Sequence, residues 1–539
     1  MAPSSASPSA PPTSSPWQVF GYRAFAVIWT ATVVSDTGTW MYNAASGWLM
    51  TRLNPAALIV SLVQVANTLP LFLLALPAGA LADMRDKRRF LITLEIWGTL
   101  GSAVLAACVS FGWINAAALL LFTFLIGVGA ALSTPAWQAI VSDLVPREQL
   151  HAAITANSTG FNVSRALGPA LGGACIAAWG MGAPFWLNAL SNLAVVAALI
   201  WWRPPRRAAA TLPAERFGNA MVLALRHARY NRTLRAALAR AVAFFLFAGA
   251  YWALLPLIAR TQLAGGPALY GVLLGAIGAG AVAAALALPR LQQRLSPGRL
   301  VALGSLGTVC SLALYGIARA APMAVLASLL AGASWIAVLS SLNTSAQLAL
   351  PEWVRGRGLA VYMAVVYGTL TISSSAWGIV AEHLGVSPTL LAAGLVGLIS
   401  IPLTRRWRLR ATATIDQSPS MHWPTPLTLH DIDAERGPVL VTVEYRIAPH
   451  DRAAFVLLLE RLGRARRRSG AYAWSMFEDT AQEGRILETF LIDSWVEHLR
   501  QHQRMTSADR HLQESVQRFN QGGTPRVTHL VALEPHASA

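Results

Sequence analysis

Charged residues are scarce in this sequence. Asp, Glu, Lys and Arg together make up 12% of the 539 residues, whereas hydrophobic residues make up 55%. An average soluble domain carries about 25% charged residues, and a disordered chain has far fewer apolar ones. The composition therefore excludes an ordinary soluble protein, excludes disorder for most of the chain, and favours a membrane protein.

Cysteine and lysine are nearly absent as well. Cys108, Cys175 and Cys310 are the three cysteines, and each lies inside an apolar run. Such a set provides neither a disulfide framework nor the paired spacing of a cysteine metal site. Lys87 is the only lysine, so arginine supplies all other basic residues, which together with the high alanine content indicates a biased genomic composition.

The N-terminus has no pattern typical of a signal peptide. Residues 1–16 are rich in Ser, Pro and Ala and lack both a basic segment and a cleavable apolar core. We expect residues 1–21 to form a disordered leader. Membrane insertion would then use an uncleaved helix.

Long apolar runs fill the chain from Tyr22 to about Arg410. About twelve of them have the roughly 20 residues that a helix needs to cross the ~30 Å hydrocarbon core of a bilayer. The sequence therefore predicts an α-helical membrane protein with six spans in residues 22–204, a central loop at 205–235 and six spans in residues 236–410.

Basic residues concentrate in every second break between the expected spans. Residues 1–410 carry 28 basic and 9 acidic side chains, and residues 411–539 carry 14 and 16, so the net charge of +17 divides into +19 and −2. The positive-inside rule then assigns both termini and the central loop to the cytoplasm, in a bacterial inner membrane. We expect no nucleic-acid partner, because that role needs basic residues on a soluble face with interleaved aromatics.

The two halves are weakly similar to each other. The segment Leu144–Leu150 and the small-residue helix after it recur in outline at Leu350–Leu359. Repeated halves are typical of secondary transporters that rock around a site near the membrane midplane. Between the halves, residues 217–230 have an amphipathic pattern and either lie on the inner membrane surface or form a partly helical, solvated linker.

The composition changes after Arg410. A linker rich in Ser, Pro and Thr at 411–437 precedes a segment with the pattern of a soluble domain at 438–535. Alternating apolar residues predict strands near 439–447, 471–478, 485–493 and 527–533, with helices at 451–468 and after a capping box at Ser494 and Glu497. This β-α-β-β-α-β order predicts a cytoplasmic α+β domain of the ferredoxin-like type.

The break after the second span contains Gly79-Ala80-Leu81-Ala82-Asp83-Met84-Arg85-Asp86-Lys87-Arg88-Arg89. It resembles the loop shared by the major facilitator superfamily, in which the glycine lets helices approach and the Asp joins a charge network at the cytoplasmic gate. The resemblance implies a gating role for Gly79, Asp83, Arg85, Arg88 and Arg89, although Met84 and Asp86 replace the usual Arg and Gly. A plain positive-inside loop is the alternative.

The fifth span contains Gly168-Pro169-Ala170-Leu171-Gly172-Gly173. It resembles the motif of proton-coupled antiporters in the same superfamily, with Ser164 in place of the leading glycine, and it implies an exporter. Pro169 removes a helix hydrogen bond, and Gly168, Gly172 and Gly173 allow close packing. A packing kink without meaning for transport is the alternative.

Further segments resemble one branch of the superfamily, the transmembrane secretion effectors, related to the enterobactin exporter. They are Ser35–Met41, Leu69–Gly79, Pro135–Gln138 and, in the tail, Ser494–His502. The resemblance covers nearly the whole chain and implies a twelve-helix transporter in a lipid bilayer with a small-molecule substrate and no cofactor. The tail resembles cofactor-free monooxygenases of antibiotic synthesis, which indicates shape more than chemistry.

Ionisable residues within spans are costly and usually functional. Asp36 lies near the middle of span one and Arg165 near the middle of span five, so we expect a charge pair at the central cavity that loads and releases a proton. A static structural pair is the alternative. Asn157 and Asn162 are candidates for substrate binding or for hydrogen bonds between helices.

His498 and His502 share one helix face at i, i+4, a spacing that can ligate zinc. No acidic residue completes a known metalloprotease pattern, so the sequence predicts neither a metal nor a catalytic site. It favours a proton-coupled exporter of small amphipathic molecules such as drugs, siderophores or secondary metabolites. An uptake permease, or a membrane-tethered enzyme or sensor acting through the tail, is the alternative, and the oligomeric state is not specified.

Overall fold

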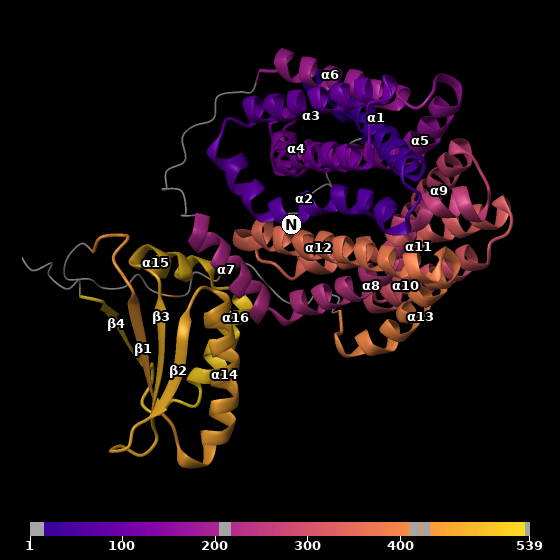
Figure 1. Ribbon diagram of the computed structural model, residues 1–539. Helices are drawn as coiled ribbons and strands as arrows, with labels where there is room; N and C mark the ends of the chain where they lie inside the picture. The colour runs from indigo at the N-terminus through magenta and orange to yellow at the C-terminus, as the bar shows by residue number, and fades with distance from the viewer. Residues whose placement is uncertain (1–15, 204–216, 410–419, 421–422, 424–431, 534–539) are drawn as a thin grey trace, which may run out of the picture.

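The computed structural model describes residues 16–203, 217–409, 420, 423 and 432–533, and long helices dominate it (Figure 1). The first group of helices comprises α1 (Arg23–Leu53), α2 (Ala57–Met84), α3 (Lys87–Ser110), α4 (Ala116–Leu144), α5 (Leu150–Trp179) and α6 (Ala183–Trp201). The second group comprises α8 (Arg232–Leu257), α9 (Pro267–Arg294), α10 (Pro297–Ile317), α11 (Ala321–Leu348), α12 (Glu352–Leu384) and α13 (Val386–Leu403). These groups are called the N-half and the C-half.

Within the described residues, 10 helices are long and apolar enough to cross a membrane. The protein is therefore a multi-pass membrane protein. The two long helices outside that set are α1, with 31 residues, and α5, with 30. Both contain the most polar stretches of the bundle, near Asp36 in α1 and between Asn157 and Arg165 in α5, which lowers their mean hydropathy.

The halves meet mainly along two helix pairs, α2 with α12 and α5 with α9, and α2 also contacts α8. Along the first pair, the Thr68 and Thr371 hydroxyls are 2.8 Å apart. Along the second pair the backbones approach closely, since a Cβ atom on Gly173 would lie 3.1 Å from Gly271 Cα and 2.7 Å from the Pro267 carbonyl oxygen. Only glycine permits this distance.

The two ends of the bundle differ in how closely the halves pack. At the far end, where α5 ends and α9 begins, Gly173 and Gly271 are in contact. At the opposite end, where α2 ends and α12 begins, a Cβ on Gly79 or on Gly356 would meet no atom within 4 Å. We call the latter the α7 end, because α7 (Phe217–Tyr230) packs there against α12.

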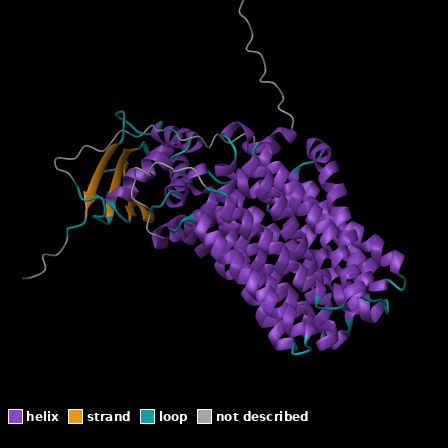
Figure 2. Cartoon of the chain, turned by 90° about the horizontal axis from the view of Figure 1, so that it is seen from above, coloured by secondary structure: helices purple, strands orange, loops and turns teal. Residues whose placement is uncertain are grey.

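The C-terminal residues form a separate small sheet beside the helices (Figures 1 and 2). Its elements are β1 (Val439–Arg446), α14 (Arg452–Arg468), β2 (Tyr472–Glu478), β3 (Arg485–Ile492), α15 (Trp495–Arg504), α16 (Ser507–Gln517) and β4 (Arg526–Val531). The strand order is β2-β3-β1-β4, and every pairing is antiparallel. Alternate residues of β1 are buried beneath α14, with Phe455 fully buried.

Two helices, rather than the single one expected, follow β3. α15 begins at the expected Ser494 cap, whose hydroxyl accepts from the Glu497 amide at 3.4 Å. Helix α15 ends with Met505 as its C-cap. Thr506 then starts α16 with a complete capping box to Asp509. The usual capping-box pattern does not identify the second box, T-S-A-D, because its fourth residue is Asp instead of Glu.

One expectation for the loops is wrong. The leader is not disordered up to residue 21, because Pro16–Gly21 forms a short helix and Val19 is completely buried in the N-half core; residues 1–15 lie outside the described part. The amphipathic segment at 217–230 forms helix α7, which buries Leu223, Ala224 and Ala228 against protein, while Leu225 is 49% exposed.

Candidate functional site

Arg165 is a buried cation between the halves. Its side chain extends from α5 and is 8% exposed. The guanidinium carbon lies 5.6 Å from the ring centroids of both Trp40, on α1, and Trp252, on α8. Cation–π contacts of this kind partly replace the lost hydration of the charge.

The groups around Arg165 leave polar atoms unpaired. Arg165 Nε, the Tyr251 hydroxyl and Trp252 Nε1 are buried and have no hydrogen-bond partner among the described residues. Tyr251 and, from α12, Tyr367 both interact electrostatically with Arg165. Buried polar atoms without partners are rare in proteins and indicate a place for a water molecule or a ligand.

Sequence reasoning missed these tyrosine and tryptophan partners. Trp252 and Tyr367 lie about 90 and 200 residues from Arg165 along the chain, and no local pattern connects residues so distant. Four helices from both halves meet at this guanidinium, so the site exists only where α1, α5, α8 and α12 converge.

Asp36 does not pair with Arg165, contrary to expectation. Among the described residues Asp36 forms no ion pair, and its charge interacts with that of Glu95 on α3. Glu95 Oε1 accepts a hydrogen bond from Trp137 Nε1 at 3.2 Å. Asp36 therefore faces α3 within the N-half, one turn before Trp40, whereas Arg165 faces the C-half.

The polar residues of α1 are held by α6. The Ser35 hydroxyl donates to Asn192 Oδ1 at 2.7 Å, and the Thr39 hydroxyl donates to Asn188 Oδ1 at 3.4 Å. These bonds fix the rotation of α1 and thus the direction of Asp36. The structure thus forms one acidic pair within the N-half and one basic centre between the halves.

The two asparagines of α5 differ in their contacts. Asn162 Nδ2 donates to the Ser158 carbonyl one turn earlier, at 2.8 Å. Asn157 is half-buried and has no side-chain hydrogen bond within the described part of the chain. Neither amide joins two helices, which leaves Asn157 available to a ligand.

The glycine-rich motif of α5 forms two close helix contacts. A Cβ on Gly168 would lie 2.8 Å from the Thr37 carbonyl oxygen, and one on Gly172 would lie 3.0 Å from Met41 Cα, both on α1. Gly173 faces α9 on the other half, and Pro169 is buried in the same helix. The motif therefore lets a single helix contact both α1 and the opposite half.

The loop between α2 and α3 is built around helix ends. The Asp86 side chain accepts from the Arg89 amide at 2.8 Å and caps α3. Arg88 donates from Nε to the Leu199 carbonyl at 2.7 Å and so caps the C-terminal end of α6. Arg85 and Arg89 are exposed, and the side chain of Asp83 lies outside the described atoms.

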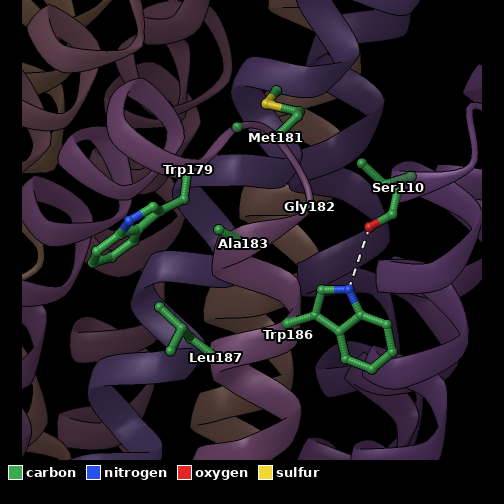
Figure 3. A pocket seen from close by; sticks show the side chains of 9 residues that line it. Ser110, Trp179, Met181, Gly182, Ala183, Trp186 and Leu187 are labelled. Atoms are coloured by element: carbon green, nitrogen blue, oxygen red, sulfur yellow. Dashed lines mark hydrogen bonds between the residues drawn. The ribbon is translucent and has the colours of Figure 1, made fainter.

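A pocket of about 580 Å³ lies at the far end of the N-half (Figure 3). Trp179, Met181 and Leu187 line it, and Trp186 Nε1 donates to the Ser110 hydroxyl at 3.3 Å across it. Arg165 precedes Trp179 on the same helix by about 21 Å at 1.5 Å per residue. The pocket is thus separate from the guanidinium site.

The C-terminal domain contacts the bundle through α7. Arg226 on α7 donates to the Gly470 carbonyl at 3.3 Å and lies 3.7 Å from Asp493. Arg504 on α15 stacks over the ring of Trp353 on α12, 4.9 Å from its centroid. The domain therefore rests at the α7 end of the bundle.

His227 lies inside this contact. It is 1% exposed, and its Nδ1 is 3.2 Å from the Arg468 carbonyl oxygen. Burial, followed by the charge of Arg468, lowers the pKa of His227 to about 3. The imidazole is therefore neutral while the domain is docked.

Three histidines of the C-terminal domain lie together. His498 and His502 of α15 and His529 of β4 each have one ring nitrogen within 4.8 Å of the other two. They are the residues of the described chain best arranged to hold a metal ion.

Solved structures with this arrangement of helices are transporters. A POT family transporter in complex with a thioalcohol-conjugated peptide matches with a TM-score of 0.59 at 13% identity, over 71% of this chain and 95% of that one. A bacterial homologue of the human lysosomal transporter Spinster, inward-facing and unoccupied, matches with a TM-score of 0.56 at 15% identity, over 73% and 98%. The helical bundle of this chain therefore has the fold of these two structures.

The family follows from the sequence of nearly the whole chain. The model of the transmembrane secretion effector family matches residues 14–537, which includes the C-terminal domain. The chain belongs to this family.

Curated relatives match over shorter stretches. The staphyloferrin A transporter of Staphylococcus aureus is 29% identical over 143 residues, 26% of this chain and 36% of that protein. MdtD of Escherichia coli, which is named for multidrug resistance, is 31% identical over 170 residues, 31% of this chain and 34% of that protein. The matches thus span about a third of each relative's length.

Proposed function

We propose that this protein is a proton-coupled antiporter that exports small amphipathic molecules by alternating access. The observation that carries the proposal is the separation of Asp36 from Arg165. Asp36 lies beside Glu95 without a cation among the described residues, while Arg165 lies between aromatic rings of both halves. During alternating access, the Asp36 and Glu95 pair can then exchange protons in one step and Arg165 can bind the substrate in another.

The proton site is the Asp36 and Glu95 pair. Two neighbouring carboxylates within a membrane are costly when both are charged, so the pair favours holding a proton. Trp137 orients Glu95 by its hydrogen bond. Movement of α1 against α3 and α4 during gating would change the separation of the two acids and release the proton.

The substrate site is centred on Arg165. An arginine held between Trp40 and Trp252 presents its unpaired Nε and its planar face to a ligand. A carboxylate attached to an apolar or aromatic body matches both features. The name of the staphyloferrin A transporter supports a siderophore as one candidate, and that of MdtD supports a drug.

Twelve spans are proposed, with α1 and α5 added to the ten apolar helices. Each is long enough to cross, and each packs along neighbouring helices, α1 against α5 and α6, and α5 against α9. Several of their polar residues are buried against protein, such as Ser35 on α1 and Ser164 and Arg165 on α5. The ferredoxin-like fold is proposed for the C-terminal domain on the support of its β2-β3-β1-β4 order.

The α7 end is proposed to face the cytoplasm, with both termini on that side of a bacterial inner membrane. Arginine-rich breaks support this orientation, and exposed aromatic residues, Phe111, Trp113 and Trp179, mark the far end as the outer interface. The close contact of Gly173 with Gly271 at the far end supports an inward-facing conformation.

The test uses inverted vesicles that have been acidified inside, with a pH-sensitive dye and a panel of amphipathic carboxylic acids. Addition of a transported compound should drive protons out of wild-type vesicles. Asp36→Asn and Glu95→Gln should each reduce this flux by about tenfold or more, whereas Glu460→Gln, on the exposed face of α14, should leave it unchanged. Full coupling in Asp36→Asn would refute the proton role, and lower accumulation of the compound in cells lacking the protein would reverse the direction to uptake.

A further inference from the structure

The three histidines of the C-terminal domain converge from two elements. His498 and His502 lie one turn apart on α15, and His529 reaches them from the edge strand β4. The ring centroids are 4.7 Å apart for His498 and His502 and also for His498 and His529. Because β4 and α15 are separated by α16, this meeting depends on the fold of the domain.

The separation of the nitrogen atoms matches a tetrahedral metal site. His498 Nε2 and His502 Nε2 are 3.2 Å apart. Two imidazoles that bind one Zn²⁺ at 2.0–2.1 Å in tetrahedral geometry have nitrogens about 3.3 Å apart. A third nitrogen within 4.8 Å completes a set of three that needs only small rotations of the rings.

The surroundings favour neutral imidazoles, which are the form that binds metal. His498 is 1% exposed, and the rings of Trp495 and Trp423 cover His498 and His502, respectively. The cation Arg466 is near His498, and its Nε atom lies 3.5 Å from the buried carboxylate of Glu488. The negative charge of Glu488 offsets that of Arg466.

Gln501 supplies a further observation. Its side chain is 1% exposed and lies beside the His498 ring. The Gln501 amide and His498 Nδ1 stop short of normal hydrogen-bond geometry, so a small movement of either side chain would join them. Ligand histidines commonly use their second ring nitrogen for such an outer contact, which fixes the ring on the metal.

We propose that His498, His502 and His529 bind a divalent transition-metal ion of the Zn²⁺ class, with a fourth position left to water. The ion joins α15 to β4. Since α15 also carries Arg504, which stacks on Trp353 of the bundle, metal binding stiffens the element through which the domain contacts the transporter.

The experiment measures Zn²⁺ binding to the full-length chain, purified in detergent with a tag free of histidine and stripped with a chelator. Titration calorimetry should give one Zn²⁺ per chain, and the unfolding temperature should rise on addition of Zn²⁺. His502→Gln and His529→Gln, which replace partly exposed residues and spare buried His498, should each weaken binding by about tenfold or more.

The matched control is His450→Gln, in the same domain, whose side chain is 82% exposed. It should bind Zn²⁺ like the wild type. Absence of binding by the wild type, or equal binding by wild type, His502→Gln and His529→Gln, would overturn the proposal and leave a neutral hydrogen-bonded histidine pair. Neither result depends on transport, so the proposed function is tested separately.

Discussion

Arg165 shows how one side chain can connect the two halves of the bundle. It originates on α5 of the N-half and contacts Trp252 on α8 of the C-half. Any rocking of the halves changes this contact, because the two helices belong to different rigid groups. A substrate anion at Arg165 would therefore influence which conformation is favoured.

Substitutions at Arg165 should distinguish the effect of its charge on transport from the effect of its planar shape. Arg165→Gln should lower the transport of carboxylic acids into inverted vesicles by about tenfold or more, because the substrate site loses its cation. Arg165→Lys should restore part of the rate, because a lysine keeps the charge but loses the planar stacking. The exposed Arg319→Gln serves as the control, and equal rates for Gln, Lys and wild type would contradict a substrate role.

Glycines at helix crossings matter through the space that a Cβ would need. In the C-half, a Cβ on Gly332 of α11 would overlap the Ile277 carbonyl oxygen of α9. The backbone of α9 cannot yield in the way that a flexible side chain can. We expect Gly332→Ala to destabilise the bundle by about 1–3 kcal/mol.

The comparison for that substitution is Gly356→Ala on α12, where a Cβ meets nothing within 4 Å. Its unfolding temperature in detergent should equal or slightly exceed that of the wild type, because alanine is the better helix former. A similar loss of thermal stability in both variants would show that packing at Gly332 is not the cause.

At the scale of single elements, α7 has the most distinctive position. Its buried face contacts α14 of the C-terminal domain and α12 of the bundle, so it joins two parts of the molecule. Asn231, at its end, donates to the Ala349 carbonyl at 2.7 Å and caps α8 with its Oδ1 atom. The same turn of the chain therefore ends the helix on which the C-terminal domain docks and begins the first helix of the C-half.

Docking of the domain should weaken in acid because of His227. The ordinary pKa of a histidine is 6.5, and that of His227 in the docked state is about 3. Burial and the charge of Arg468 lower it, and Asp509 opposes them with a smaller effect. Below pH 6.5 the undocked state therefore binds more protons, so the stability of docking is complete above that value and falls as the pH falls toward 3. The loss is on the order of 1 kcal/mol at pH 5.5.

Hydrogen exchange of the α7 amides at pH 7.5 and 5.5, corrected for the intrinsic rate, measures this effect. His227→Asn should remove the pH dependence, while His450→Gln, exposed on the same domain, should keep it. Equal protection of α7 in the wild type at both pH values would contradict the role of His227.

At the scale of the whole molecule, the contacts between the halves do not include the C-terminal domain. They run along α2 with α12 and α5 with α9, whereas the domain reaches α7 and the start of α12. The domain therefore covers one end of the bundle without forming part of the path between the halves (Figure 1).

Removal of residues 411–539 should leave transport in inverted vesicles intact, within about twofold of the full-length protein. The truncated protein should unfold at a lower temperature, because His227 and Trp353 lose their cover. Loss of all transport, with the protein correctly inserted and folded, would instead favour a protein that acts through its tail.

The sequence by itself determined the apolar helices and most of the C-terminal strands. Hydrophobic runs and alternation depend on neighbours within about twenty residues, and burial acts on them directly. The glycines of the α5 motif were also predictable, since close packing requires a residue without a side chain wherever the partner lies.

Only the tertiary structure decided which charges and rings meet. Asp36 and Arg165 both project from polar helices, but the hydrogen bonds of α1 to Asn192 and Asn188 rotate Asp36 toward Glu95. His529 joins His498 and His502 through the pairing of β4 with β1. Such contacts join residues far apart in the chain, and their identity depends on helix rotation and strand register, which no local pattern of apolar and polar residues specifies.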